Sequence, residues 1–318
     1  MKYTPCSPNA SREARNVLEY LAGLRGNGIA LGQHTQTRAQ EELLYIRNIT
    51  GKEPALCGFE LLAYSPNINY RESGEECLTE VEENKDTLNN AWEWAERKGL
   101  ITFTWHWFSP LYGADKAFYQ KNTPFDARLA LKEGTPERKA FFSDMDAMAR
   151  LLKPFKEKKV PILWRPFHES EGTWFWWGSR GPETARALYL DMYRHYTGVH
   201  GLDNLIWVWN SPLPEGYVGD SFCDVISRDV YLENNTHSDY REAYNELVKI
   251  TSAEKISALG ESGPVPDIEK LSQTRIPWTW FMTWSKGRCT ENVTSHEMLR
   301  SAYNCGYGVT LDKLPALY

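Results

Sequence analysis

Several features that would point to other classes of protein are missing from this chain of 318 residues. No apolar run approaches the length of a membrane-spanning helix, and no signal peptide is recognisable. The chain has no block of basic residues and a formal net charge of −6, so nucleic acids and anionic membrane surfaces are poor candidate partners. We therefore expect no membrane span and no nucleic-acid partner, and a neutral or small ligand fits better.

The six cysteines include no C-x-x-C pair, so they predict neither a zinc site nor a redox dithiol. If the protein is exported, Cys57 with Cys77, or Cys289 with Cys305, could close local disulfides. Buried free thiols are an equally good interpretation. Residues 1–5 are already polar. We interpret this as a mature form without its signal, and we expect an extracellular or cell-surface location and a monomer.

Short β-rich runs alternate with amphipathic stretches along the whole chain. The candidate strands cover residues 29–32, 55–60, 101–105, 161–165, 205–209, 224–231, 256–261 and 279–284. The helical patterns cover residues 11–25, 80–98, 136–158, 182–199, 238–251, 265–274 and 294–303. Eight strands alternating with helices predict an α/β fold, a (β/α)8 TIM barrel, with residues 1–318 as a single domain. No Gly-rich phosphate loop, which would support the rival doubly wound sheet, is present.

Polar and aromatic residues follow the predicted strands directly. In a (β/α)8 barrel the carboxyl ends of the strands carry the functional side chains. The residues at those ends are Trp105-His106, Arg165 to Glu169, Trp209-Asn210, Asp229-Val230-Tyr231, Glu261 and Trp284. The barrel prediction thus places a set of chemically capable side chains at one mouth.

The stretch from Trp164 to Gly178 contains two carboxylates and an Arg-His pair beside four Trp and two Phe side chains. Sugar rings stack their C–H faces on indoles, and carboxylates handle protons and developing positive charge. The chain also has 13 Trp and 17 Tyr, which could form a Trp-rich core. A buried Trp needs a partner for its N–H, however, so many tryptophans often mark a binding groove. This combination predicts a site that binds and cleaves a sugar.

Glu169 and Glu261 are the central candidates, because each follows an apolar strand where a carboxylate adds nothing to packing. Retaining glycosidases need two carboxyl groups about 5–5.5 Å apart, and strand ends that face each other across a barrel mouth can provide that separation. The alternative is a pair of solvated loop glutamates. The surrounding aromatic residues favour the catalytic interpretation.

Other side chains at the strand ends complete the predicted site. His106 and His168 are candidate partners for sugar hydroxyls, and His168-Glu169 lacks the second histidine that a zincin-type metal site needs. The Tyr231 phenol could hydrogen-bond the nucleophile and keep it ionised. The candidates for stacking on a sugar are Trp174, Trp176, Trp177 and Trp284, of which Trp176 and Trp177 could equally fill the wall behind the site. The histidines assigned to surface or helix positions are His195, His200, His237 and His296.

The whole chain resembles glycoside hydrolase family 26, which is dominated by β-1,4-mannanases. The most specific motif is His-Glu-x-x-Gly-x-Trp-Phe-Trp-Trp-Gly, which begins at His168. The other matching segments are Gly32-Gln33-His34, Thr104-Trp105-His106, Asn210-Ser211-Pro212, residues 217–220, Asp224, Asp229-Val230-Tyr231, Glu261 and Trp284. The resemblance implies a (β/α)8 fold and hydrolysis with retention of anomeric configuration.

The resemblance also implies a role for individual residues. Glu169 would be the acid/base and Glu261 the nucleophile, with no cofactor and no metal required. The residues implied around the sugar at the cleavage point are His168, Trp174 and Tyr231, and those implied on the glycone side are His106 and Asp224. Three positions depart from the family pattern: Ser285 where some mannanases carry an Arg, Arg228 where an aromatic is common, and Glu60 where an Asp is common.

The sequence therefore predicts a retaining endo-β-1,4-mannanase that hydrolyses mannan, glucomannan or galactomannan. One alternative is a family member that acts on β-1,3-xylan or mixed-linkage glucan, or that releases short products from chain ends. A second alternative is a non-catalytic carbohydrate-binding barrel, against which the presence of both glutamates argues.

Overall fold

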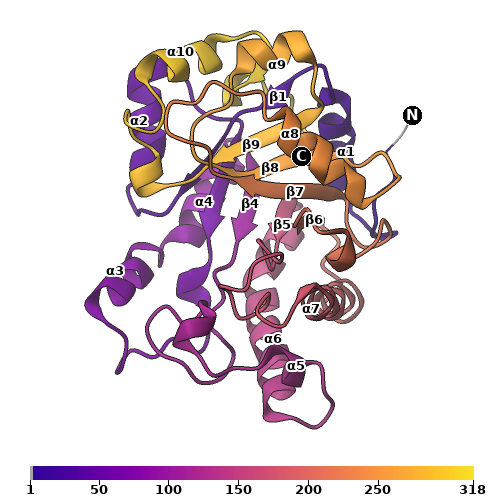
Figure 1. Cartoon of the computed structure of the whole chain (residues 1–318). Coiled ribbons are helices and arrows are strands. Elements are labelled where there is room, and N and C mark those ends of the chain that lie inside the picture. The colour runs from indigo at the N-terminus through magenta and orange to yellow at the C-terminus, as the bar shows by residue number, and fades with distance from the viewer. Residues whose placement is uncertain (1–2) are drawn as a thin grey trace.

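Parallel strands close into a barrel in the computed structural model, which describes residues 3–318 (Figure 1). The strands of the barrel are β2 (Gly32–Thr35), β3 (Leu56–Glu60), β4 (Leu100–Thr104), β5 (Ile162–Arg165), β6 (Leu205–Asn210), β7 (Val225–Val230), β8 (Ile256–Ser262) and β9 (Trp278–Thr283). Each strand pairs with the next along the chain, and β9 pairs back to β2 through Gln33 and Thr283. The predicted (β/α)8 barrel is confirmed. Met1 and Lys2, part of the polar stretch noted above, lie outside the described residues.

The first predicted strand is interrupted in the structure. Its residues form β1 (Ile29–Ala30) and β2, separated by Leu31, and β1 also pairs with β9 and with a short strand near the carboxyl end, β10 (Gly308–Val309). The remaining seven strands match the predicted ranges to within one or two residues at each end.

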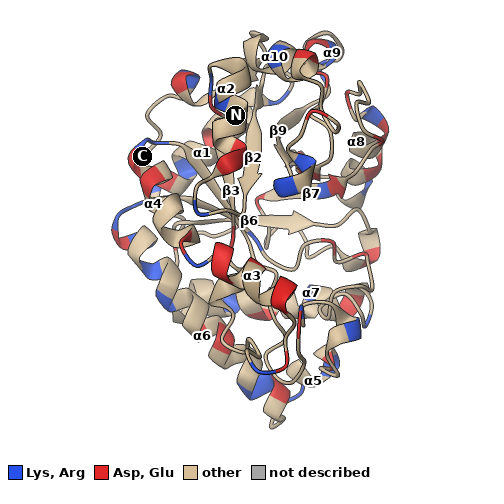
Figure 2. Cartoon of the chain, turned by 90° about the vertical axis from the view of Figure 1, so that its left-hand side faces the viewer, with Lys and Arg blue, Asp and Glu red and all other residues tan. Residues whose placement is uncertain are grey.

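Helices surround the strands (Figure 1). They are α1 (Arg12–Leu24), α2 (Glu41–Thr50), α3 (Glu75–Glu83), α4 (Thr87–Glu96), α5 (Ala127–Ala130), α6 (Pro136–Glu157), α7 (Pro182–Arg194), α8 (Arg241–Leu247), α9 (Ile268–Thr274) and α10 (His296–Asn304). Charged side chains lie mainly on these helices and on the loops, and few lie on the strands (Figure 2). Among residues 3–318, no helix combines the length and the apolar character that crossing a bilayer requires.

Capping side chains fix where two of the predicted helices begin. The Ser11 hydroxyl accepts a hydrogen bond from the backbone N–H of Ala14, and the Thr135 hydroxyl accepts one from Arg138, with Pro136 in the first turn of α6. Such caps satisfy backbone donors that a helix start leaves free. The predicted starts of α1 and α6 are therefore confirmed.

The single helix predicted over residues 80–98 is wrong, because the structure has two helices, α3 and α4. Asn84 ends α3: its side chain is buried and donates to the Glu80 carbonyl at 2.8 Å, which competes with the helical pattern. None of the predicted helical ranges includes α2. Its N-cap residue, Gln40, makes no side-chain cap, so the sequence carries no start signal there.

The cysteines are all free thiols, and Cys57, Cys77 and Cys223 are buried. Neither of the two possible disulfides forms, so the interpretation as unpaired thiols is correct. Trp207 and Trp209 on β6 are fully buried, so both side chains pack in the core.

The two ends of the described chain lie against the amino ends of the strands. The Tyr318 hydroxyl donates to the carbonyl of Gly99, which directly precedes β4, at 2.6 Å. The Asn16 side chain on α1 donates to the Leu317 carbonyl at 3.0 Å, so the terminal segments also contact each other. This leaves the carboxyl ends of the strands free of terminal segments.

Candidate active site

Three carboxylates meet at the carboxyl ends of the strands. Glu169 follows β5, Asp229 is near the end of β7, and Glu261 is near the end of β8. One carboxylate oxygen from each lies within 4.8 Å of the others. A register shift between Arg228 and Asp229 interrupts the pairing of β7 with β8. Such a bulge re-aims the side chains that follow it, and it lies where Asp229 joins the cluster.

Glu261 is held by two strong donors. The Arg165 guanidinium donates through Nη2 to one carboxylate oxygen, and the Tyr231 hydroxyl donates to the other at 2.5 Å. Arg165 is almost fully buried and also donates to Asp229 at 2.9 Å. Burial and the Asp229 charge raise the pKa of Glu261, and Arg165 and Tyr231 oppose that rise. Glu261 is thus the member of the cluster in direct contact with both a permanent cation and a phenol.

Fewer hydrogen-bond donors stabilise the charged form of Glu169 than that of Glu261. Its carboxylate accepts one hydrogen bond, from the Trp174 indole N–H at 2.7 Å. Burial, followed by the charges of Asp229 and Glu261, raises the pKa of Glu169 well above the ordinary value for a glutamate. Two carboxyl groups in unequal surroundings suit an acid and a nucleophile, because one retains a proton that the other releases.

The backbone around Glu169 is strained. Phe167 and Glu169 have φ angles of 52° and 53°, in the left-handed region that few non-glycine residues adopt. The Glu169 N–H donates to the Asn210 side chain at 2.7 Å, and Asn210 in turn donates to Asp229 at 2.8 Å. Strain of this kind persists where surrounding contacts fix the conformation, and it clusters at functional sites.

A chain of hydrogen bonds runs through both predicted histidines. The Glu60 carboxylate, fully buried, lies 2.7 Å from His106 Nδ1, and His106 Nε2 lies 3.1 Å from His168 Nε2. Burial disfavours the charged ring of His106, but Glu60 outweighs this and raises the His106 pKa. Burial, with the positive charges of His106 and Arg165, lowers the pKa of His168. His168 is therefore a neutral, enclosed ring that supports its neighbours, and His106 is the more accessible of the two.

Only some of the predicted aromatic residues reach the surface. Trp174 is 47% exposed and Tyr231 is 41% exposed. Trp284 is half-buried and stacks on His34 with ring centroids 4.0 Å apart. Trp176 and Trp177 are buried and donate to backbone carbonyls at 2.7 and 2.8 Å, so they form the wall behind the site. Trp174, Tyr231 and Trp284 remain the candidates for contact with a ligand.

Asp224 does not lie with the other candidates. It precedes β7 at the amino end of the barrel, where its carboxylate accepts from the backbone N–H groups of Cys6 at 2.7 Å and Trp207 at 2.8 Å. Its carbonyl also accepts a hydrogen bond from the Tyr3 hydroxyl. A strand rises about 3.3 Å per residue, so Asp224 lies about 16 Å from Asp229 along β7. The prediction of Asp224 as a ligand-binding residue is wrong, and its role is to hold the segment before α1.

Arg165, Asp229 and Asn210 belong to the site but were not predicted as site residues. Each lies at the end of a predicted strand, which is the signal that could have identified them. Their role depends on contacts between β5, β6, β7 and β8, which follow from closure of the barrel.

The structure shows what the side chain contacts at each of the three positions that depart from the family pattern. The Ser285 hydroxyl is buried and donates to the Gln36 side chain, so it presents no cation. Arg228 turns toward α8 and pairs with Glu246 at 2.6 Å. Glu60 holds His106, as described above. A nearby cation is Arg288, which lies 5.1 Å from the centre of the Tyr231 ring.

Comparison with known proteins gives an independent indication of relationship. Residues 6–313 match the family described as "Glycosyl hydrolase family 26". The chain is 36% identical to a mannan endo-1,4-beta-mannosidase of Thermothelomyces thermophilus, over 97% of this chain and 62% of that protein. It is 30% identical to mannan endo-1,4-beta-mannosidase A of a Piromyces species, over 98% of this chain and 51% of that protein. The chain thus spans about half to two thirds of the length of these relatives.

Solved structures show the same fold. A Podospora anserina GH26-CBM35 beta-(1,4)-mannanase superposes with a TM-score of 0.88 at 33% identity, covering 99% of this chain and 70% of that chain. A beta-mannanase from a symbiotic protist of the termite Reticulitermes speratus, solved with a gluco-manno-oligosaccharide, superposes with a TM-score of 0.87 at 29% identity, covering 98% of both chains.

The charge of Asp229 is expected to raise the Glu169 pKa measurably. In the Asp229→Asn variant one negative neighbour is lost, the charged form of Glu169 becomes more favourable, and its pKa should fall. The measurement is an NMR titration of the glutamate side-chain carboxyl carbons, with Glu169 assigned from a Glu169→Gln variant. Asp239→Asn, which removes a buried carboxylate paired with Arg241, is the control and should leave the Glu169 titration unchanged. An unchanged or higher Glu169 pKa in Asp229→Asn would contradict the electrostatic argument.

Proposed function

The chain belongs to glycosyl hydrolase family 26, and from this premise we propose that it is a retaining endo-β-1,4-mannanase. The observation that carries the proposal is the approach of Glu169 and Glu261 within 4.8 Å in unequal surroundings. Retaining glycosidases have carboxyl groups about 5–5.5 Å apart, whereas inverting enzymes need about 6.5–9.5 Å to admit a water molecule. The short separation favours direct attack by one carboxylate on the sugar.

Glu261 is the nucleophile in this proposal. Its carboxylate attacks the anomeric carbon, a covalent glycosyl-enzyme bond forms, and the bond from that carbon to the leaving oxygen breaks. The donors on Glu261 favour its ionised form before attack. Arg165 can then pair more fully with Asp229 as the charge on Glu261 is lost in the ester.

Glu169 acts first as an acid and then as a base. Its raised pKa lets it hold the proton that the leaving oxygen receives in the first step. In the second step the ionised Glu169 takes a proton from water, the water oxygen bonds to the anomeric carbon, and Glu261 is released. The cycle restores both carboxyl groups, and it requires no cofactor and no metal.

The proposed substrate is β-mannan, glucomannan or galactomannan, which is supported by the printed names of the relatives. Trp174 and Trp284 offer ring faces for sugar stacking, and Tyr231 and His106 offer polar partners. A polysaccharide does not cross a lipid bilayer, so we place the enzyme outside the cell or on its surface. Action on β-1,3-xylan or mixed-linkage glucan, and release of short products from chain ends, are the alternatives that the experiment below distinguishes.

A panel of polysaccharides tests the substrate. Reducing ends released from glucomannan and galactomannan should far exceed those released from β-1,3-xylan, mixed-linkage glucan and carboxymethyl cellulose. A rapid fall in the viscosity of glucomannan, early in the reaction, would indicate internal cleavage. Activity confined to the xylan or the glucan would refute the mannan proposal, and a soluble, folded protein inactive on every polymer would favour the carbohydrate-binding alternative.

Azide rescue tests the division of roles between the two glutamates. Glu169→Ala can still form the glycosyl-enzyme from a β-glycoside with a good leaving group, and azide should then attack it to give the β-glycosyl azide. Glu261→Ala cannot form that intermediate, so azide should attack the substrate directly and give the α-azide. NMR identifies the anomer from each variant.

The opposite pattern of anomers would reverse the assignment of the two glutamates. Glu171→Ala is a matched control, because this neighbouring glutamate is also half-buried but is not in the three-carboxylate cluster. The Glu171→Ala variant should hydrolyse the same activated substrate without added azide.

Trp174 is expected to matter for hydrolysis and little for stability. Its ring is 47% exposed, so Trp174→Ala should change the free energy of unfolding by much less than the roughly 3–5 kcal/mol that a buried Trp costs. The loss of the N–H donated to Glu169 and of a sugar-stacking face should lower kcat/KM by tenfold or more, on the order of 1.4 kcal/mol of transition-state stabilisation. The measurements are urea unfolding and initial rates on glucomannan.

Trp92→Ala is the matched control for Trp174→Ala. Trp92 lies on α4, where it stacks on Phe155 with ring centroids 3.9 Å apart. This substitution should lower stability and leave activity per folded molecule unchanged. A destabilised Trp174→Ala variant with normal activity per folded molecule would show that Trp174 has a packing role.

A further inference from the structure

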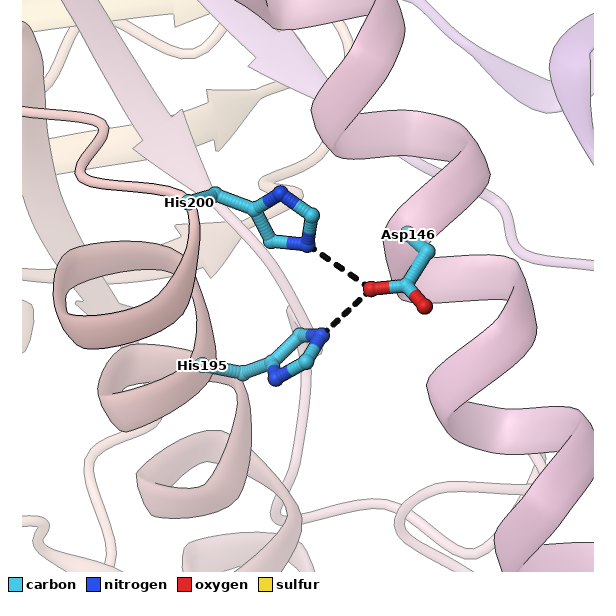
Figure 3. Close-up of side chains that lie close together, drawn as sticks. All are labelled: Asp146, His195 and His200. Carbon is cyan, nitrogen blue, oxygen red and sulfur yellow. Dashed lines mark hydrogen bonds and ion pairs between the residues drawn. The ribbon is translucent and has the colours of Figure 1, made fainter.

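A second group of chemically capable side chains lies on the outside of the barrel. Asp146 is in the middle of α6, and His195 and His200 belong to the turn that follows α7. Figure 3 shows both imidazole rings pointing toward the same carboxylate oxygen from the opposite side. His195 Nε2 lies 2.6 Å and His200 Nε2 lies 2.7 Å from Asp146 Oδ1. Both histidines were predicted to occupy surface or helix positions.

The turn geometry accounts for the meeting of the two histidines. In an α-helix, residues five apart are separated by about 140° around the axis, so their side chains diverge. Residues His195–Val199 instead form a π-helical turn, in which the His200 N–H donates to the His195 carbonyl at 3.1 Å. The wider turn places His195 and His200 one above the other. Isolated π turns of this type are frequent at functional sites.

The orientation of the two rings is fixed by aromatic neighbours. Phe142 on α6 packs against the His195 ring with centroids 5.0 Å apart and planes at 89°. The two imidazoles meet edge to face at 4.8 Å, and Tyr196 contacts the His200 ring at 6.1 Å. The donor atoms are therefore held in place by packing as well as by their bonds to Asp146.

Asp146 has no permanent cation as a partner. Over residues 3–318, the groups that pair with its carboxylate within 4.0 Å are His195 and His200, and no Lys or Arg is among them. With neutral imidazoles, the cluster therefore carries one negative charge and offers three atoms that can ligate a metal ion. The carboxylate side chain is 41% exposed and that of His200 is 24% exposed, which leaves a side open to water.

We propose that Asp146, His195 and His200 bind a divalent transition metal, with Zn²⁺ the best match, and that the metal joins α6 to the end of α7. Two imidazole nitrogens and a carboxylate oxygen suit Zn²⁺, with water as a fourth ligand. Tetrahedral bonds of about 2.0–2.1 Å require donor atoms about 3.3 Å apart. The His195 and His200 Nε2 atoms now lie 2.6 and 2.7 Å from the Asp146 oxygen. Each of these two distances has to grow by about 0.6 Å when the metal binds, which the exposed Asp146 side chain allows.

Metal titration of the full chain without a histidine tag tests the proposal. After removal of metals with a chelator, calorimetry at about pH 7.5 should show saturable binding of one Zn²⁺ per chain. Co²⁺ in place of Zn²⁺ should give the visible absorption of a low-coordinate site. Zn²⁺ should also raise the melting temperature, because it binds the folded state.

Substitutions locate the metal. His195→Ala and His200→Ala should each weaken Zn²⁺ binding by at least about tenfold, since even second-sphere changes cost 10–100-fold at metal sites. Asp146→Asn keeps the size of the side chain and the π turn, and it should also weaken binding if either histidine variant fails to fold. His237→Ala is the matched control, because His237 is exposed and lies 3.8 Å from a single carboxylate, Asp267.

Two results would overturn the proposal. One is the absence of saturable Zn²⁺ binding by the folded wild-type chain. The other is undiminished binding by folded Asp146→Asn or folded histidine variants, which would place the metal elsewhere, for example at the three carboxylates of the candidate active site. Hydrolysis is not needed as a readout, so this result does not depend on the proposed function.

Discussion

A single buried guanidinium faces more negative charge than it can neutralise. Arg165 contacts Asp229 and Glu261, and Glu169 lies within 4.8 Å of both carboxylates. Removing charges from water is costly unless they are paired, so a third ionised carboxylate here would be strongly unfavourable. The cluster therefore retains a proton, and Glu169, which has only an indole donor, is where that proton is best held. The proposed roles of Glu169 as the acid and Glu261 as the nucleophile thus follow from where one arginine is placed.

The barrel provides the scaffold for this arrangement. Arg165 ends β5, and the two carboxylates it contacts come from β7 and β8, so three strands have to close in the correct order before the charges are paired. The left-handed backbone at Phe167 and Glu169 and the bulge before Asp229 are local costs that this closure offsets. The same contacts make the site rigid, which preorganises it for charge that develops during bond cleavage.

The sequence was sufficient for the barrel because its strands are short and apolar and alternate with helical patterns, and because Ser11 and Thr135 mark helix starts. It was also sufficient to identify Glu169, Glu261 and Tyr231 as neighbours, since each ends a strand. It failed for Asp224, which precedes its strand by one residue. Asp224 therefore lies at the amino end of β7, about 16 Å along the strand from Asp229, and not with the residues at the carboxyl ends.

Other features could not be predicted because they depend on distant contacts. The break between α3 and α4 depends on the buried Asn84 side chain, and the role of Arg165 depends on strands that are far apart in sequence. The meeting of His195 with His200 depends on a π turn, which a regular helical periodicity does not predict.

The position of the chain ends determines which face of the barrel stays exposed when either terminus is fused to another segment or tethered to a support. The Tyr3 hydroxyl bonds near the start of β7 and the Tyr318 hydroxyl near the start of β4, so both ends leave from the face opposite the three carboxylates. Any segment fused to either end would therefore extend away from the barrel mouth. A barrel tethered to a solid support by either terminus would present the face that holds the three carboxylates away from that support.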